Sequence, residues 1–259
     1  MDIIQQMQSH RSIRKYKSDP IPDEYLNKIL ESALRASSSG NIQIVSIIIT
    51  KDPENKKKLW ELHSRQDMIL EAPVILTFCA DWNRMNKWCR ENDAEPGFDN
   101  FMCFMVSAGD AFISAQNAAL AAEHLGLGIC FMGTTLWNNK GLADFLHCPK
   151  DVLPITTLVV GYPAEEPPLR DRLPLNSILH NEHYKDYSVE DINRTYKNRE
   201  TEGWARYMSI PNLRDKVEQA GVKTLAQIYT DIKYTKDNNI RCSNMLLDSI
   251  REKGFMNNK

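Results

Sequence analysis

The segment His10–Tyr16 concentrates residues that can bind an anion. It reads His-Arg-Ser-Ile-Arg-Lys-Tyr, which places Arg11 and Arg14 three positions apart. A guanidinium is always charged, and its planar fork suits two phosphate oxygens at once. On a helix, positions three apart share a face, so the two arginines could close on one anion. We therefore predict a phosphorylated ligand; the alternative is a solvated basic turn that anchors the N-terminus.

Composition excludes several other classes of function. The chain has 259 residues, 42% of them hydrophobic and 25% charged, and a formal net charge of −2. These values are typical of a globular protein with a full core and give no support for a nucleic-acid partner. No apolar run approaches the ~20 residues that span a bilayer, and the first residues lack the pattern of a signal peptide. We therefore expect a cytoplasmic protein.

Cysteine and histidine spacing predicts neither a disulfide framework nor a metal site. The six cysteines form no Cys-x-x-Cys pair, and Cys79, Cys103 and Cys130 lie in apolar surroundings typical of core positions. His180 and His183 are three apart but lack further spaced ligands. We therefore expect no metal.

Helical and strand patterns alternate along the first 186 residues. Runs rich in β-branched or apolar residues predict strands at 45–50, 74–79, 129–132 and 155–160. Apolar periodicity and alanine content predict four helices. The first starts at the helix-start signal 21–24 and runs to 34, and the others are at 54–64, 107–125 and 142–146. From Tyr187 onward strand signals disappear and the chain becomes polar, so we divide it into a core, 1–186, and a helical extension, 187–259, that wraps the core or a partner subunit.

Two common nucleotide-binding signatures are missing. Gly126-Leu127-Gly128 resembles the opening of a dinucleotide fingerprint, but the next glycine is Gly133 and these glycines precede a strand. The chain has no phosphate-binding loop that ends in glycine-lysine-serine or threonine, and no Gly-x-Ser-x-Gly elbow. A nicotinamide cofactor, if used, is therefore not held by a Rossmann half.

Ordered motifs across residues 10–184 resemble the nitroreductase and flavin reductase family. The N-terminal match is His10-Arg11-Ser12-Ile13-Arg14, and the serine-rich match is Arg35–Gln43. The resemblance continues at 78–81, 115–118, 123–128, 151–154, 161–164, 172–174 and 180–182. It is strongest to the oxygen-insensitive, NADPH-preferring bacterial nitroreductases. It implies an α+β fold of three layers, with a central mixed sheet flanked by helices and a wrapping C-terminal extension.

The resemblance implies FMN as cofactor and NADPH or NADH as electron donor. It assigns Arg14 and Arg172 to the phosphate, with Arg170 in place of a lysine that is usual in the family. The other positions that match cofactor-binding residues are His10, Arg11, Ser12, Ser38, Ser39, Gln66, Gly133 and Thr134. Arg194, Lys197, Arg199 and Arg206 occupy the region that meets NADPH in the subgroup, and Arg206 is the candidate; the alternative is a solvated helix face.

The implied activity is an FMN-dependent NAD(P)H oxidoreductase that reduces nitro compounds, quinones or flavins by ping-pong hydride transfer through flavin N5. FMN carries the chemistry, so we assign no catalytic side chain. The resemblance also implies a homodimer with FMN at the interface, for which the alanine-rich helix is suited; ordinary packing within one chain is the alternative. A non-catalytic FMN or nucleotide-binding sensor or storage protein remains open, because arginine clusters bind phosphate without turnover.

One match departs from the family pattern. Relatives carry two glycines followed by leucine and arginine, whereas this chain reads Gly133-Thr134-Thr135-Leu136-Trp137. Contacts to the flavin ring are therefore expected to differ more from the family than contacts to the phosphate.

Overall fold

The structure, a computed structural model, describes residues 2–258 and divides the chain into two compact units. The first unit comprises the residues up to 169 together with those from 242 onward, and the second comprises Arg170–Arg241. The expected division near residue 186 remains a prediction, as does the wrapping of 187–259 around the core or a partner.

A four-stranded sheet forms the centre of the first unit. Its strands are β1 Val45–Thr50, β2 Val74–Asp81, β3 Gly128–Met132 and β4 Val152–Gly161. They lie in the order β1-β2-β4-β3, and every pair of neighbours in this sheet is antiparallel. The four strands are thus antiparallel where we expected a mixed sheet, and the one parallel pairing among the described residues is an isolated bridge between Ser12 and Ile129.

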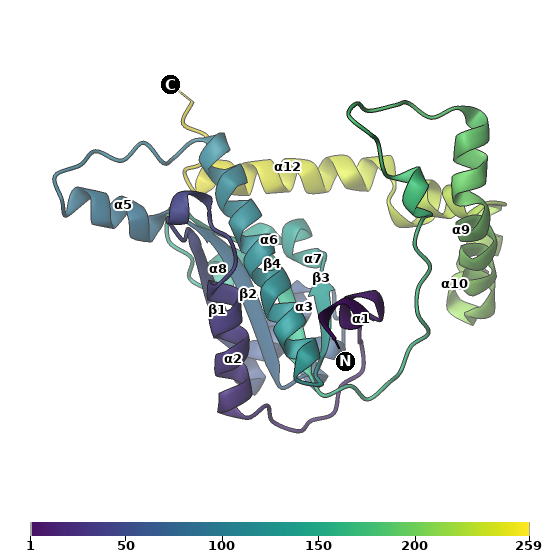
Figure 1. Ribbon diagram of the computed structural model, residues 1–259, viewed down its shortest axis with the longest axis horizontal. Helices are drawn as coiled ribbons and strands as arrows, with labels where there is room; N and C mark the ends of the chain where they lie inside the picture. The colour runs from purple at the N-terminus through teal and green to yellow at the C-terminus, as the bar shows by residue number, and fades with distance from the viewer. Residues whose placement is uncertain (1, 259) are drawn as a thin grey trace. The chain divides into compact units, whose positions relative to one another are not determined.

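Helices cover both faces of this sheet. The helices of the first unit before β3 are α1 Ile3–Gln8, α2 Asp23–Leu34, α3 Pro53–Leu62, α4 Met68–Glu71, α5 Asn83–Arg90 and α6 Phe101–His124. Those after β3 are α7 Thr134–Trp137 and α8 Asn139–Phe145. Figure 1 shows α2 and α6 crossing one face of the sheet.

The side chains of β2 alternate between two hydrophobic clusters, one on each face of the sheet. Leu76 and Phe78 pack with α2 and α6 in the larger cluster, whereas Ile75 packs with residues of α3, α4 and α8 in the smaller one. Successive side chains of a strand point to opposite faces, so one strand serves both clusters. All eight residues of β2 are buried, so this strand is covered on both faces.

Helix α6 is the longest helix of the first unit. The side chain of Asn100 caps it by accepting a hydrogen bond from the Cys103 N–H. Six of its seven alanines are buried, which lets α2 approach closely, and the Ser114 hydroxyl donates to the Ala33 carbonyl at 3.0 Å. The helix begins six residues earlier than the predicted start at Ser107.

The second unit is helical. It contains the short 3₁₀ turn Leu175–Ser177, then α9 Val189–Ser209, α10 Pro211–Ala220, α11 Leu225–Gln227 and a π-helical turn, Ile228–Lys233. Tyr207, Val217, Leu225 and Ile228 form its small core. The last helix, α12 Lys236–Glu252, begins in this unit and ends in the first one, where Ile250 is buried.

Within residues 2–258, no helix is both long and apolar enough to cross a membrane.

Candidate functional site

The basic segment near the N-terminus is extended rather than helical. Ser12 bridges to Ile129 of β3, and the Ile13 N–H donates to the Ile129 carbonyl at 2.9 Å. The helical spacing that we used to pair Arg11 with Arg14 is therefore wrong, because side chains three apart on an extended chain point to opposite sides. The segment gains its rigidity from the edge of β3 and from the buried side chains of Ile13 and Tyr16.

The two guanidinium groups of this segment keep unused hydrogen-bond donors. Arg11 Nη1 lies 3.0 Å from Glu166 Oε1, but its buried Nε has no hydrogen-bond partner within the described chain. Arg14 is exposed, and its Nη1 makes one long contact, 3.5 Å, to the Ser12 carbonyl. A buried donor without a partner costs about 1–3 kcal/mol, so Arg11 Nε fits an acceptor supplied by a ligand.

Four carboxylates contact this segment, and one of them, Glu71, accepts from the Tyr16 N–H at 3.0 Å. Glu165 accepts from the backbone N–H groups of Arg14 at 2.6 Å and Lys15 at 3.1 Å, and so fixes the main chain. His10 Nδ1 lies 2.5 Å from Glu123 Oε1 of α6. Glu166 competes with an anion for Arg11, but its side chain is 86% exposed and can leave into water at little cost.

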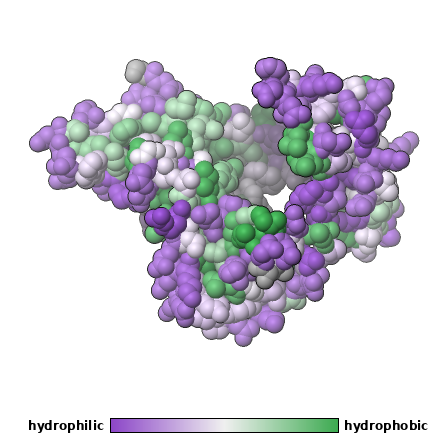
Figure 2. All heavy atoms as spheres, viewed as in Figure 1, coloured by the Kyte–Doolittle hydropathy of each residue, from purple (hydrophilic) through white to green (hydrophobic). Residues whose placement is uncertain are grey.

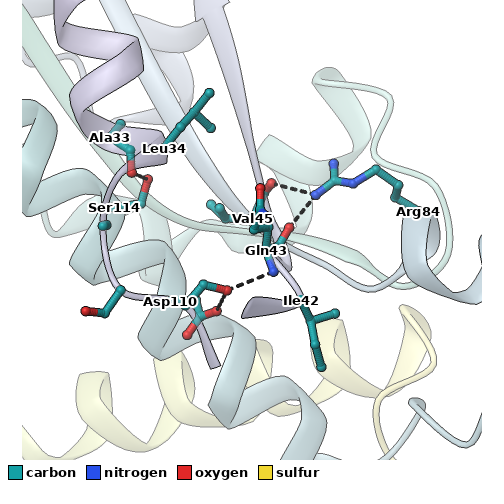
Figure 3. Close-up of a pocket in the computed structure, with 11 residues that line it drawn as sticks. Ala33, Leu34, Ile42, Gln43, Val45, Arg84, Asp110 and Ser114 are labelled. Carbon is teal, nitrogen blue, oxygen red and sulfur yellow. Dashed lines mark hydrogen bonds between the residues drawn. The ribbon is translucent and has the colours of Figure 1, made fainter. Parts of the chain in front are cut away.

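The serine-rich loop forms a second cluster around one carboxylate of α6. Asp110, which is 4% exposed, accepts from the Ser38 hydroxyl at 2.8 Å and from the Ser39 hydroxyl at 2.9 Å. The Ser39 N–H also donates to this carboxylate, at 3.0 Å. Figure 3 shows Asp110 facing the loop from α6, with Arg84 on the other side of Gln43. The two predicted serines are thus brought together by a residue that sequence reasoning did not select.

A third cluster unites Gln66 with Thr134. Gln66 Nε2 lies 3.5 Å from Thr134 Oγ1, and the ring nitrogen Nδ1 of His63 lies 2.8 Å from the same oxygen. His63 is fully buried, and burial lowers its pKa to about 4, so the imidazole is neutral at pH 7. Its Nε2 has no hydrogen-bond partner among the residues described.

An apolar hollow of about 490 Å³ opens beside Gly133, at the end of β3. Phe112, Ile113, Phe131, Met132, Leu136 and Ile155 supply most of its lining. Nothing lies within 4 Å of where a Cβ on Gly133 would stand, so the backbone there is open to a ligand. The guanidinium donors of the basic segment and this open backbone along β3 suit the phosphate and ring of FMN.

The remaining predicted residues belong to the second unit. Arg172 Nη1 donates to the Asp171 carbonyl at 3.0 Å, next to Arg170. Arg199 pairs with the Asp171 carboxylate at 2.8 Å, and Arg194 with Asp191 at 2.5 Å. Arg206 is exposed near the end of α9. Convergence of these arginines with Arg11 and Arg14 on one cofactor remains a prediction.

Comparison with known proteins identifies the family. The model of the Nitroreductase family matches residues 7–162. An FMN reductase (NAD(P)H) of Bacillus subtilis is 34% identical over 244 residues, which cover 86% of this chain and 98% of that protein. An oxygen-insensitive NADPH nitroreductase of Salmonella typhimurium is 34% identical over 182 residues, 70% of this chain and 74% of that protein.

Solved structures agree with this match. The NfrA1 nitroreductase of B. subtilis superimposes with a TM-score of 0.86 at 29% identity, covering 99% of this chain and 100% of that one. This chain therefore belongs to the nitroreductase family, and its fold is that of the family.

Sequence reasoning missed His63, Asp110 and the glutamates that contact the basic segment. Asp110 carried a usable signal, since it lies between Gly109 and Ala111 among the small residues of an alanine-rich helix, and a buried charge needs partners. His63 carried none, because its role depends on Thr134, 71 positions away.

Proposed function

We propose that this chain is an FMN-dependent NAD(P)H oxidoreductase that reduces nitro compounds, quinones or flavins. Membership of the nitroreductase family and relatives named FMN reductase and NADPH nitroreductase support this function. The observation that carries it is the pair of guanidinium groups beside the edge of β3: the buried Arg11 Nε has no partner among the described residues, and Arg14 Nη1 makes only one long contact.

The residues of the chain bind and orient the cofactor. Bound FMN would supply the chemistry by accepting a hydride from NAD(P)H and passing electrons to the acceptor. Arg14 and Arg172 would hold the phosphate, and Arg170 would add charge beside them. Arg11 would lie at the ring edge, where a fixed cation stabilises negative charge that develops during reduction. No side chain needs to act as a general acid or base.

A homodimer completes this proposal. Large apolar side chains on α6 are exposed, among them Met102, Met105, Phe112 and Ile113, although the opposite face of the same helix is buried. Figure 2 shows hydrophobic patches over α6 and α1. Apolar surface of this kind is typical of protein interfaces and supports the proposed dimer, in which FMN would lie beside the interface. Light scattering should give the mass of a dimer, and Phe112→Asp should shift the equilibrium toward a monomer that loses flavin.

The proposal also covers the cellular compartment in which the protein works and its electron donor. All six cysteines are free, as is usual in the reducing cytoplasm, and we infer that the protein works there. NADPH is the expected donor, with Arg206 near its 2′-phosphate.

Cofactor identity tests the proposed function. The purified protein should release FMN, and not FAD, on denaturation, and the holoprotein should oxidise NADPH when a quinone or nitroaromatic acceptor is added. A protein that takes up no flavin would end this proposal.

A further inference from the structure

The two serine hydroxyls of the serine-rich loop have no donor left for a ligand. A serine hydroxyl carries one hydrogen, and Asp110 accepts both the Ser38 and the Ser39 hydroxyl hydrogens. The Ser38 oxygen in turn accepts from the Gln43 N–H at 2.8 Å. The hydroxyls therefore cannot donate to a phosphate while Asp110 holds them, and they offer only oxygen lone pairs and the backbone beside them.

A second charged residue holds the far end of this loop. Arg84 of α5 donates to the carbonyls of Gln43 and, at 3.2 Å, Val45. Its other nitrogen, Nη1, lies 3.5 Å from Asp81. The loop is thus held between a carboxylate on α6 and a guanidinium on α5, with a hollow of about 350 Å³ between them.

The backbone of the loop shows why it needs to be held. Gly40, Asn41 and Gln43 have φ values of 57°, 55° and 58°, in the left-handed region. This region costs a non-glycine residue about 1–2 kcal/mol. A free loop would leave this conformation, so the hydrogen bonds to Asp110 and Arg84 select it.

We propose that Asp110 is a positioning residue that fixes the serine-rich loop, Ser38–Gln43, in the one conformation that receives the cofactor. This inference rests on the proposed function. It assigns the loop to the part of FMN other than the phosphate, because its hydroxyl donors are already used. Asp110 acts through Ser38 and Ser39 and does not itself touch the cofactor.

The first test uses affinity for two flavins. Asp110→Asn keeps the size of the side chain but replaces one acceptor oxygen with a donor, so it cannot accept both serine hydroxyls and the Ser39 N–H. We expect FMN and riboflavin binding to weaken by the same factor, about tenfold, which is the loss of one such hydrogen bond. Ser114→Ala is the matched control, because Ser114 is a buried hydroxyl of the same helix that bonds Ala33 instead of the loop.

The second test needs no flavin. In the apoprotein, Asp110→Asn should speed amide hydrogen exchange of residues 38–43 about tenfold or more and leave the amides of β2 and β4 unchanged. Ser39→Ala should do the same to a smaller degree. Combining it with Asp110→Asn should add little further, because both changes remove one interaction.

Each result decides the proposal. Unchanged amide exchange of the loop in Asp110→Asn would overturn it, because Asp110 would then not fix the loop. Faster amide exchange throughout the sheet would also overturn it, because Asp110 would then stabilise the whole fold. A loss confined to FMN would also overturn it, because the loop would then serve the phosphate. If the unmodified protein binds no flavin, the proposed function fails, while local acceleration of loop exchange in the apoprotein still establishes that Asp110 fixes the loop.

Discussion

The basic segment His10–Tyr16 and the serine-rich loop Ser38–Gln43 were both expected to hold the cofactor, but the fold uses them differently. In the basic segment Glu165 binds the main chain, and the guanidinium groups of Arg11 and Arg14 keep donors for a ligand, although the exposed Glu166 pairs with Arg11. In the loop a carboxylate binds the side chains themselves. Residue type therefore identifies candidates for a site, whereas the hydrogen-bond partners decide which of them are available to a ligand.

His63 shares features of both regions. Its Nδ1 is hydrogen-bonded to Thr134, whereas its buried Nε2 has no partner among the described residues. Because burial lowers its pKa from 6.5 to about 4, the unfolded chain binds more protons than the native one in that range. The free energy of unfolding should therefore fall as pH drops from 6.5 to about 4, by about 3 kcal/mol from this residue.

Urea unfolding at a series of pH values measures this effect. His63→Asn, whose amide can still meet Thr134, should flatten the profile in that window compared with the unmodified protein. Equal slopes for both proteins would show that His63 is protonated without cost, and hence that Nε2 meets an acceptor or water.

The phosphate arginines give the next largest effect. Arg14→Ala and Arg172→Ala should each weaken FMN binding by about one to two decades, since a charge-assisted hydrogen bond is worth about 1.5–3 kcal/mol. The affinity for riboflavin, which lacks the phosphate, should fall less. Lys17→Ala, which removes an exposed cation nearby, is the control for general loss of charge. If the affinities for FMN and riboflavin fall by the same factor, these arginines have a structural role, like the hydroxyls of the serine-rich loop.

Arg206 should give the smallest effect, because it is exposed and solvent screens its charge. We expect NADPH to outcompete NADH and Arg206→Ala to reduce that preference severalfold, by about 0.5–1 kcal/mol, with NADH rates nearly intact. The preference should also shrink as salt is added. Equal rates with NADH in the unmodified protein would remove Arg206 from the site.

Local sequence patterns predicted most of the sheet. β1 has the predicted bounds, and β2 and β3 differ by no more than two residues at either end. β4 begins at Val152 instead of 155, because Pro154 weakens a strand signal. The ladder tolerates this proline, since the register shifts between Phe78 and Cys79, opposite Pro154–Thr156, and forms a bulge.

Elements without a buried stripe escaped prediction. α1 is short and exposes Ile3 and Ile4, and α5 buries little besides Asn86 and Cys89. The first turns of α6 also expose apolar side chains, Met102 among them, so the periodic pattern of a core helix begins later. Exposed apolar side chains blur the contrast between a buried and a polar face, which explains why periodicity alone misplaced the start of α6.

The sequence predicted those site residues whose side-chain type alone suggests a role, but not the contacts between them. Gln66 and Thr134 were selected separately, and the structure brings them together. Their shared partner His63, and the Asp110 that gathers the serines, depend on contacts between distant segments that no local pattern records.

Anaerobic reduction of the bound flavin tests the central claim most directly. Holoprotein mixed with NADPH in the absence of oxygen should lose its yellow absorbance with one NADPH consumed per flavin, and an added quinone should restore the colour. Flavin that binds but stays oxidised would contradict the account and leave a non-catalytic FMN-binding protein in its place.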